Sequence, residues 1–229
     1  LLSVINKYKE IYNMATYLEI VNNVMKRLRE PTVTSVNDNK YSALIGVLVN
    51  DSKREIEDAY DWNALATTLT ATTTEDIFNY VLVGSGTRFR VIDVYNDSDD
   101  FQLRYAPTHW MNRQFTTTNT QKASPTYYNF NGVDSNGDTQ VDIYPIPDQA
   151  YSLRFNLTVP QEDLVADNDR VMVPDHLVAM LTYAKAIAER GEDSGNLSSE
   201  AYALFKNSLA NAVAIERNHY EEEMSWVAP

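Results

Sequence analysis

Helical periodicity at both ends of the chain, interrupted by a long segment with strand periodicity, is the feature that most constrains this fold. Apolar side chains recur every three or four positions before residue 63 and after residue 173, whereas residues 65–159 alternate and are rich in Thr and Tyr. These periods place apolar residues on one face of a helix or of a strand. We predict an α+β protein whose N- and C-terminal helices form one helical bundle, with an inserted antiparallel β sandwich or barrel.

The first helix is predicted to begin at Thr16. The hydroxyl of Thr16 and the carboxylate of Glu19 are spaced for a capping box, in which each side chain accepts from the other residue's backbone N–H. Pro31 is expected to end the helix, because the residue before a proline is steered out of the α region. The apolar residues at helical spacing are Tyr17, Val21, Val24, Met25 and Leu28.

A second helix is predicted after Asn37 or Asp38, either of which supplies an N-cap oxygen. It ends before Trp62, whose large side chain we expect to anchor the core. The apolar stripe of this helix comprises Tyr41, Leu44, Ile45, Leu48, Val49, Ile56 and Ala59.

Strand-forming segments fill the middle of the chain. The clearest are LATTLTATTT, IFNYVLV, RFRVIDVY and YSLRFNLTV, and turn-forming residues separate them at positions 84–86, 96–100, 136–137 and 145–148. Four to seven antiparallel strands are therefore predicted. Residues 109–111 lie between these segments and are expected to form a short helical or irregular crossing.

Two further helices are predicted near the C-terminus. Pro174 and Asp175 suit the first turn of one helix, and Gly191 suits its end. Ser198 or Ser199 is expected to cap the other. The apolar stripes of the two helices comprise Leu177, Val178, Leu181, Ala184, Ile187 and Ala188, and then Ala201, Leu204, Phe205, Ala212, Ile215 and His219.

The changes of period predict three regions. Residues 1–63 contribute the N-terminal helices, residues 64–165 form the inserted β domain, and residues 166–229 contribute the C-terminal helices and an extended tail. The tail contains Met224, Trp226 and Val227 directly after three glutamates. Such an apolar segment is typical of an anchor for a neighbouring subunit, and a frayed terminus is the alternative.

Composition narrows the range of functions. The chain has no cysteine, which excludes disulfides, thiolate metal sites and cysteine nucleophiles. A formal net charge of −13 argues against nucleic-acid binding, which needs a Lys/Arg surface. The same charge suits the wall of a passage through which DNA slides. No signal peptide or membrane span is recognisable, so we expect a soluble protein that is cytoplasmic when made.

No catalytic, cofactor or metal site is predicted. His109, His176 and His219 fall on three different elements without a nucleophile motif beside them. The run from Asp134 to Asp142 has the alternating oxygen ligands of a calcium loop. However, its glycine stands at loop position four, and a proline replaces the final glutamate, so a β-turn is the favoured interpretation.

Several segments together resemble phage head-to-tail connector proteins. They are YLEIVNNVMKRLREP at residues 17–31, VNDSKREIE at residues 49–57, SPTYY at 124–128, DIYPIP at 142–147 and VPD at 173–175. The resemblance covers most of residues 15–220 and is closest to the tail adaptor of short-tailed bacteriophages. Each motif alone is weak, and their order and spacing carry the similarity.

The resemblance implies a virion structural protein without enzymatic activity or cofactors. It implies a ring, typically a dodecamer, that joins the portal protein to the tail nozzle protein and lines the DNA passage during tail assembly and genome ejection. A ring needs apolar surface on opposite faces of one subunit. The residues expected to contact partners or other copies are Met224, Trp226, Val227, Leu177, Leu181, Leu204 and Phe205.

Two alternatives remain open at this point. With 32 acidic residues, a pair of carboxylates suited to a virion-associated cell-wall hydrolase is easily found. A carbohydrate- or protein-binding module is the other alternative, because aromatic side chains gather in the β segment. Those aromatic residues are Trp110, Tyr127, Tyr128 and Phe130. Cross-strand packing explains them equally well.

Overall fold

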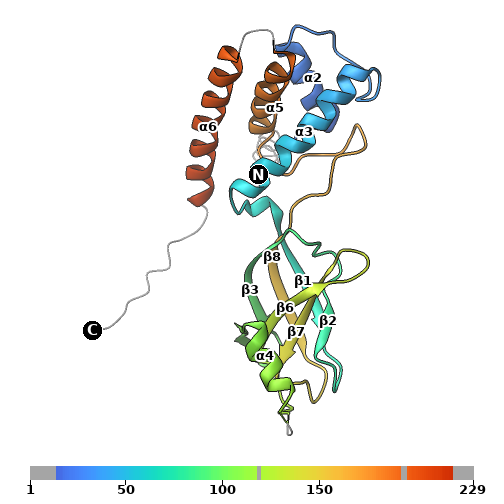
Figure 1. Cartoon of the computed structure of the whole chain (residues 1–229), viewed down its shortest axis with the longest axis vertical. Coiled ribbons are helices and arrows are strands. Elements are labelled where there is room, and N and C mark those ends of the chain that lie inside the picture. The colour runs from blue at the N-terminus through green and yellow to red at the C-terminus, as the bar shows by residue number, and fades with distance from the viewer. Residues whose placement is uncertain (1–13, 118–119, 192–194, 219–229) are drawn as a thin grey trace, which may run out of the picture. The chain divides into compact units, whose positions relative to one another are not determined.

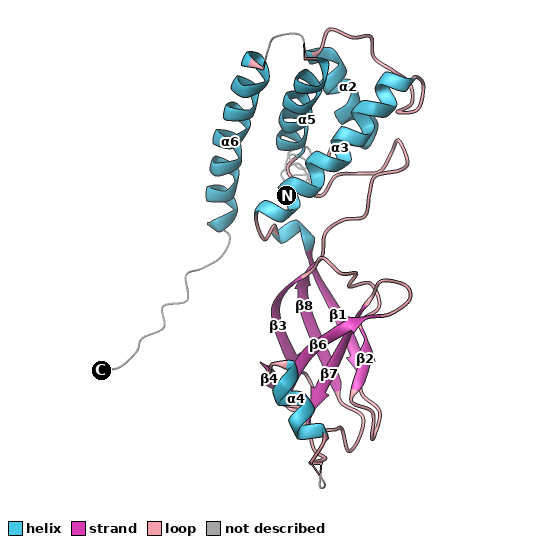
Figure 2. Cartoon of the chain, viewed as in Figure 1, coloured by secondary structure: helices cyan, strands magenta, loops and turns pink. Residues whose placement is uncertain are grey.

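The computed structural model describes residues 14–117, 120–191 and 195–218, and the chain divides into two compact units. The helical unit draws on residues 1–64 and 161–229, and the β unit consists of residues 65–160 (Figure 1). Figure 2 shows that the strands belong to one unit, together with the helix α4, and that the other described helices belong to the other unit. The predicted α+β class is confirmed.

The helical unit is built on four described helices, which come from both ends of the chain and pack against one another. Both α2 and α3 pack against α5, and α6 packs against α5. The bounds are α2 (Tyr17–Arg27), α3 (Lys40–Ala59), α5 (Asp175–Arg190) and α6 (Asn196–Arg217), and the 3-10 turn η1 (Asn63–Leu65) follows α3.

The first helix begins as predicted but ends earlier. The carboxylate of Glu19 accepts from the backbone N–H of Thr16 at 2.8 Å, and the hydroxyl of Thr16 accepts from the N–H of Glu19 at 3.2 Å. The helix ends at Arg27 because Arg29 adopts a left-handed conformation (φ 60°). The N–H of Glu30 then bonds the carbonyl of Met25, which closes the last turn before Pro31 is reached.

The N-cap of α3 is Asn39 rather than Asn37 or Asp38. The side-chain oxygen of Asn39 accepts from the backbone N–H groups of Tyr41 and Ser42. The carboxylate of Asp38 is engaged elsewhere, because it accepts from the N–H and hydroxyl groups in the turn that precedes the helix. Trp62 is buried as predicted, and its indole N–H donates to the carbonyl of Ile56 at 2.7 Å.

Helices α2 and α3 approach each other most closely at Gly46. A Cβ atom at Gly46 would lie 2.4 Å from the hydroxyl oxygen of Tyr17 and 2.7 Å from a methyl group of Val36. The residues buried around this crossing, at 2% exposure or less, include Ile20, Val21, Val24, Met25, Ile45 and Val49.

The boundary between α5 and α6 differs in part from the prediction. Helix α5 begins at Asp175 and ends at Gly191 (φ 64°) as expected, but Ala188 is exposed and does not belong to the buried stripe. Helix α6 begins three or four residues earlier than a cap at Ser198 or Ser199 implies, because Gly195 (φ 88°) turns the chain and serves as N-cap. The hydroxyl of Ser198 instead donates to the carbonyl of Gly195.

A buried ion pair marks the place where the chain returns from the β unit to the helical unit. Lys53 and Glu57 lie one turn apart on α3 with fully buried side chains, and the Lys53 Nζ to Glu57 Oε1 distance is 3.1 Å. Lys53 also donates to the carbonyl of Gln161 at 2.6 Å, and the N–H of Gln161 donates to Glu57. The pair therefore satisfies both backbone groups of Gln161.

Two further side chains of α3 hold the residues that follow. The amide of Asn50 accepts from the backbone N–H of Leu164 at 2.9 Å and donates to its carbonyl at 3.0 Å, as a neighbouring strand would. Arg54 pairs with Asp163. Positions 50, 53, 54 and 57 share one face of a helix, so the polar face of α3 holds the whole return segment.

The β unit consists of two four-stranded sheets, ordered β1-β8-β3-β4 and β2-β7-β6-β5. Its elements are β1 (Ala66–Thr72), β2 (Asn79–Val81), β3 (Arg90–Asn96), β4 (Phe101–Gln102), β5 (Arg104–Tyr105), α4 (Thr108–Phe115), β6 (Tyr127–Val133), β7 (Thr139–Tyr144) and β8 (Ser152–Thr158). Apolar residues of both sheets, including Val94 of β3, Phe155 of β8 and Val141 of β7, share one core.

The sheets depart from the prediction in two respects. They contain eight strands rather than four to seven. Strands β4 and β5 are only two residues long, which is too short to show the alternation of apolar and polar residues that predicts a strand. The pair β5–β6 is parallel, so this sheet is not purely antiparallel. The parallel pair follows from α4, which forms the predicted short helix at residues 109–111 and carries the chain from β5 back to the start of β6.

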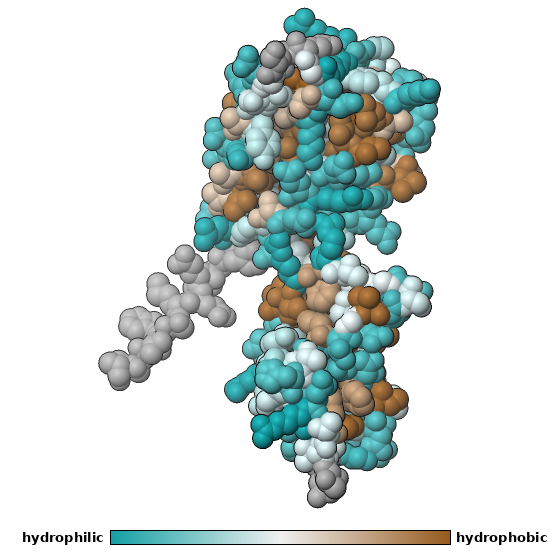
Figure 3. Space-filling model, viewed as in Figure 1, coloured by the Kyte–Doolittle hydropathy of each residue, from teal (hydrophilic) through white to brown (hydrophobic). Residues whose placement is uncertain are grey.

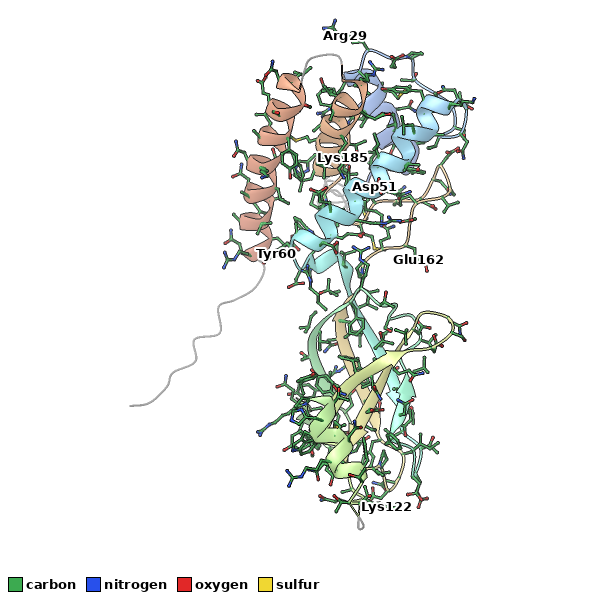
Figure 4. The ribbon with its side chains drawn as sticks, in the orientation of Figure 1. Arg29, Asp51, Tyr60, Lys122, Glu162 and Lys185 are labelled. Atoms are coloured by element: carbon green, nitrogen blue, oxygen red, sulfur yellow. The ribbon has the colours of Figure 1, made fainter. Side chains whose placement is uncertain are left out.

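Replacing Lys53 by Met is expected to destabilise the helical unit by about 3–5 kcal/mol, because the Glu57 carboxylate is then left buried without its cation. The control is Lys185→Met. Lys185, labelled in Figure 4, projects from α5 and pairs with Glu55 of α3 at a partly exposed position. This control should cost no more than about 1 kcal/mol. Denaturant unfolding followed by circular dichroism measures both, and equal losses would contradict the importance of the buried pair.

The stability of the return segment should depend on pH below neutrality. Backbone N–H groups of Val165 and Ala166 donate to Asp169, and they hold the pKa of its carboxyl below the ordinary value of 3.8. Because the folded pKa is lowered, this contribution is full above pH 3.8 and is lost as the pH falls through the folded value. Wild type should therefore exceed Asp169→Asn in unfolding free energy at neutral pH, and the difference should shrink on acidification. A difference independent of pH would contradict this.

Candidate functional site

Helix α6 carries the most prominent apolar surface of the helical unit. Only Ala201 and Phe205 of its 22 residues are buried, and both face the rest of the unit. The large apolar side chains that remain exposed are Leu197, Tyr202, Leu204 and Ile215. Figure 3 shows brown apolar atoms among teal polar atoms on this side of the helical unit.

Three of these side chains form a line along the helix. Leu197 and Leu204 are separated by about two helical turns, and Leu204 and Ile215 by about three. We call Leu197, Leu204 and Ile215 the α6 stripe. It lies next to the buried line of Ala201 and Phe205, so the apolar surface of α6 is wider than the part that α5 covers.

Hollows flank the contact between α5 and α6 on both sides. One, of about 270 Å³, is lined by Leu181, Ala184, Lys185, Ala188, Ser198, Ser199 and Tyr202. The other, of about 330 Å³, is lined by Arg27, Leu28, Arg29, Tyr183, Ile187, Arg190 and Leu197. Fewer residues of α6 are buried than of the other helices of the unit.

The structure separates the predicted contact residues into three groups. Leu177 and Leu181 of α5 are fully buried, and Phe205 of α6 is 2% exposed, so packing inside the unit accounts for their apolar character. Leu204 is 55% exposed and belongs to the α6 stripe. Met224, Trp226 and Val227 lie outside the described residues. Sequence analysis did not single out Leu197, although it follows the same spacing as Leu204.

The aromatic residues of the β unit pack mainly against one another. The rings of Trp110 and Tyr127 lie 4.8 Å apart, and those of Tyr128 and Phe130 lie 5.5 Å apart. Tyr128 belongs to the core between the sheets, whereas Trp110 and Tyr127 cover the residues that α4 buries. This arrangement accounts for the aromatic residues by cross-strand and helix packing, without a binding platform.

Residues 134–138 form a β-turn, as the glycine position suggested, and residues 139–142 belong to β7. Asp134 accepts from the backbone N–H groups of Asn136 and Asp138, and Asp138 accepts from the N–H of Gly84. Across residues 14–117, 120–191 and 195–218, no group of three His, Cys, Asp or Glu side chains is placed to hold a metal ion. In the same residues, no helix is long and apolar enough to cross a membrane.

Comparison with known proteins identifies one family. A family model described as SU10 adaptor protein matches residues 15–226. The matched range begins just before the capping box of α2 and includes every helix and strand described above. No curated protein matches the chain.

Two neighbouring residues of α6 test the distinction between core and surface. Phe205→Ala should lower the unfolding free energy of the helical unit by about 3–5 kcal/mol, because it removes a buried ring from the contact with α5. Leu204→Lys should change it by no more than about 0.5 kcal/mol, because Leu204 is exposed in the single subunit. Denaturant unfolding at a concentration that keeps the chain monomeric measures both. A large loss for Leu204→Lys would show that this side chain is not a free surface.

Proposed function

The chain belongs to the SU10 adaptor protein family, and from this premise we propose that it is the tail adaptor of a short-tailed bacteriophage. The family match supports a phage adaptor with a structural role in the virion. In the proposed function, copies of the chain form a ring, most simply a dodecamer, between the portal protein and the tail nozzle protein. The match over residues 15–226 is the single observation that carries this proposal.

The α6 stripe suits the contact between neighbouring copies. A closed ring uses a heterologous interface, in which one face of a subunit meets a different face of the next. Leu197, Leu204 and Ile215 offer three exposed apolar side chains on one face of a helix whose main contact within the unit is with α5. Burying such a line against another copy contributes free energy that the single subunit leaves unused.

The charge of the chain supports the proposed DNA passage. Each copy has a formal net charge of −13, so a ring of copies has a negative electrostatic potential at its surface. This potential repels the phosphate backbone of DNA. DNA would therefore move through without specific binding, as genome ejection requires. The proposal includes no catalytic step, no cofactor and no membrane contact, and it places assembly in the host cytoplasm.

The two alternatives have less support. A carboxylate-based hydrolase needs two acids of different pKa on either side of a substrate. The pKa values of Asp38 and Asp169 are lowered by hydrogen bonds from nearby residues that close local loops, which is a structural role for both carboxyl groups. The binding module needs exposed aromatic platforms, and the rings of the β unit are occupied with one another.

The proposed ring is tested by native mass measurement of the purified chain with and without portal protein. Wild type should reach the mass of a ring, at least with portal present. Leu204→Lys should remain monomeric, because it places a charge in the apolar contact. Leu204→Met is the matched control and should still form the ring, because it keeps the volume and the apolar character.

Each outcome has a distinct meaning. A wild-type chain that stays monomeric and ignores portal protein would contradict the proposed function. A ring that forms equally well with Leu204→Lys would remove the α6 stripe from the interface but would leave the ring itself in place.

A further inference from the structure

A second apolar feature of the helical unit is a hollow of about 330 Å³ beside the C-terminal end of α6. We call it the η1 pocket. It is lined by Met14, Trp62, Ala64, Val171, Met172, Val173, Pro174, Asp175, His176 and Glu216. Pockets for bound ligands span about 300–1,000 Å³, so this one has room for one or two large side chains.

The walls of the η1 pocket are apolar and partly adaptable. Trp62 is 2% exposed, and the hydrogen bond from its indole to Ile56 fixes the ring. Val171 and Val173 are buried beside it. Met14 and Met172 are both more than 40% exposed, and methionine is the side chain that adjusts most easily to a partner's shape. A large apolar side chain is therefore the occupant that these walls favour.

The C-terminal tail of the chain starts next to this pocket. Glu216 lines the pocket and accepts a hydrogen bond from the backbone N–H of Asn63 at 2.8 Å, so the last turn of α6 is held at the pocket's edge. The tail follows two residues later, and it supplies Met224, Trp226 and Val227 after an acidic run. Tryptophan is enriched among the buried residues that anchor protein interfaces.

The last described residue of α6 does not adopt the left-handed conformation that reverses a chain. Asn218, its C-cap, keeps a right-handed helical conformation (φ −71°, ψ −10°), whereas Gly191 at the end of α5 is left-handed (φ 64°) and reverses the chain. The eight residues from Asn218 to Trp226 can span at most about 26–29 Å, close to the diameter of a small domain.

We infer that the η1 pocket binds the Met224–Val227 segment of a second copy of this chain. The inference rests on the proposed ring, because a ring places identical pockets and tails side by side. Each subunit then gives its tail to one neighbour and receives the tail of the other, as a heterologous interface requires. The α6 stripe and the tail exchange are separate contacts, so either can be removed without the other.

Engineered cysteines test this arrangement directly, since the chain has none of its own. Met172→Cys places a thiol on the 45% exposed rim of the pocket, and Met224→Cys places one in the tail. The two single variants are produced together, assembled with portal protein and oxidised. A disulfide needs Cα atoms about 4.4–6.8 Å apart. We expect a cross-linked dimer on a denaturing gel without reductant.

Two controls separate docking from chance contact. Val165→Cys, 78% exposed on the helical unit and outside the pocket, should give no dimer with Met224→Cys. Adding Trp226→Ala to the Met224→Cys chain should reduce the yield of dimer about tenfold or more, because the anchor is lost.

The outcomes distinguish the tail exchange from the ring. A ring mass without the cross-link between positions 172 and 224 would overturn the exchange and leave the proposed function standing. A Met172→Cys/Met224→Cys double variant that forms only an intrachain disulfide would show that each tail occupies its own pocket, and this also overturns the exchange. Absence of any ring, even with portal protein, would remove the premise of both.

Discussion

The helical unit depends on the buried contact between α3 and the segment that returns from the β unit. Lys53 is the largest fully buried side chain of the described residues, and burying its charge is costly unless every donor has a partner. Glu57 and the carbonyl of Gln161 supply those partners. The return segment can therefore take only one position on α3, and this position fixes where α5 begins. The 96 residues of the β unit separate the two parts of the helical unit in the sequence. The buried contact positions the second part against the first, so that the helical core is completed.

This contact explains a motif that sequence analysis could identify but not interpret. The segment VNDSKREIE looks like an exposed, charged stretch of helix, and its resemblance to connector proteins rested on similarity alone. In the structure, Asn50, Lys53 and Glu57 face inward and bond backbone groups of residues 161–164. Periodicity assigns polar residues to solvent by default. It cannot show that a distant backbone segment replaces the solvent.

Elements governed by local chemistry were predicted well, and those governed by distant contacts were not. The capping box of Thr16 and Glu19, the start of α5 at Pro174 and the reversal at Gly191 involve groups within a few residues. Strand β5 is two residues long and parallel to β6, an arrangement that only the tertiary position of α4 explains. The candidate contact residues show the same division. Leu177 and Leu204 both lie in apolar stripes at helical spacing, but Leu177 is buried in the core and Leu204 is exposed on the surface.

The exposure of Leu204 on α6 leaves apolar surface for contacts with other subunits. The core of the helical unit is made by α2, α3 and α5, with α6 adding only Ala201 and Phe205. A helix with so few buried residues adds little to the stability of a single subunit, so its apolar surface is free to stabilise a larger structure. The same helix has the α6 stripe along its side. Its C-terminal end lies beside the η1 pocket, and the tail of the sequence follows this end. In the proposed ring, copies that meet through both contacts would bury what α6 leaves exposed in the single subunit.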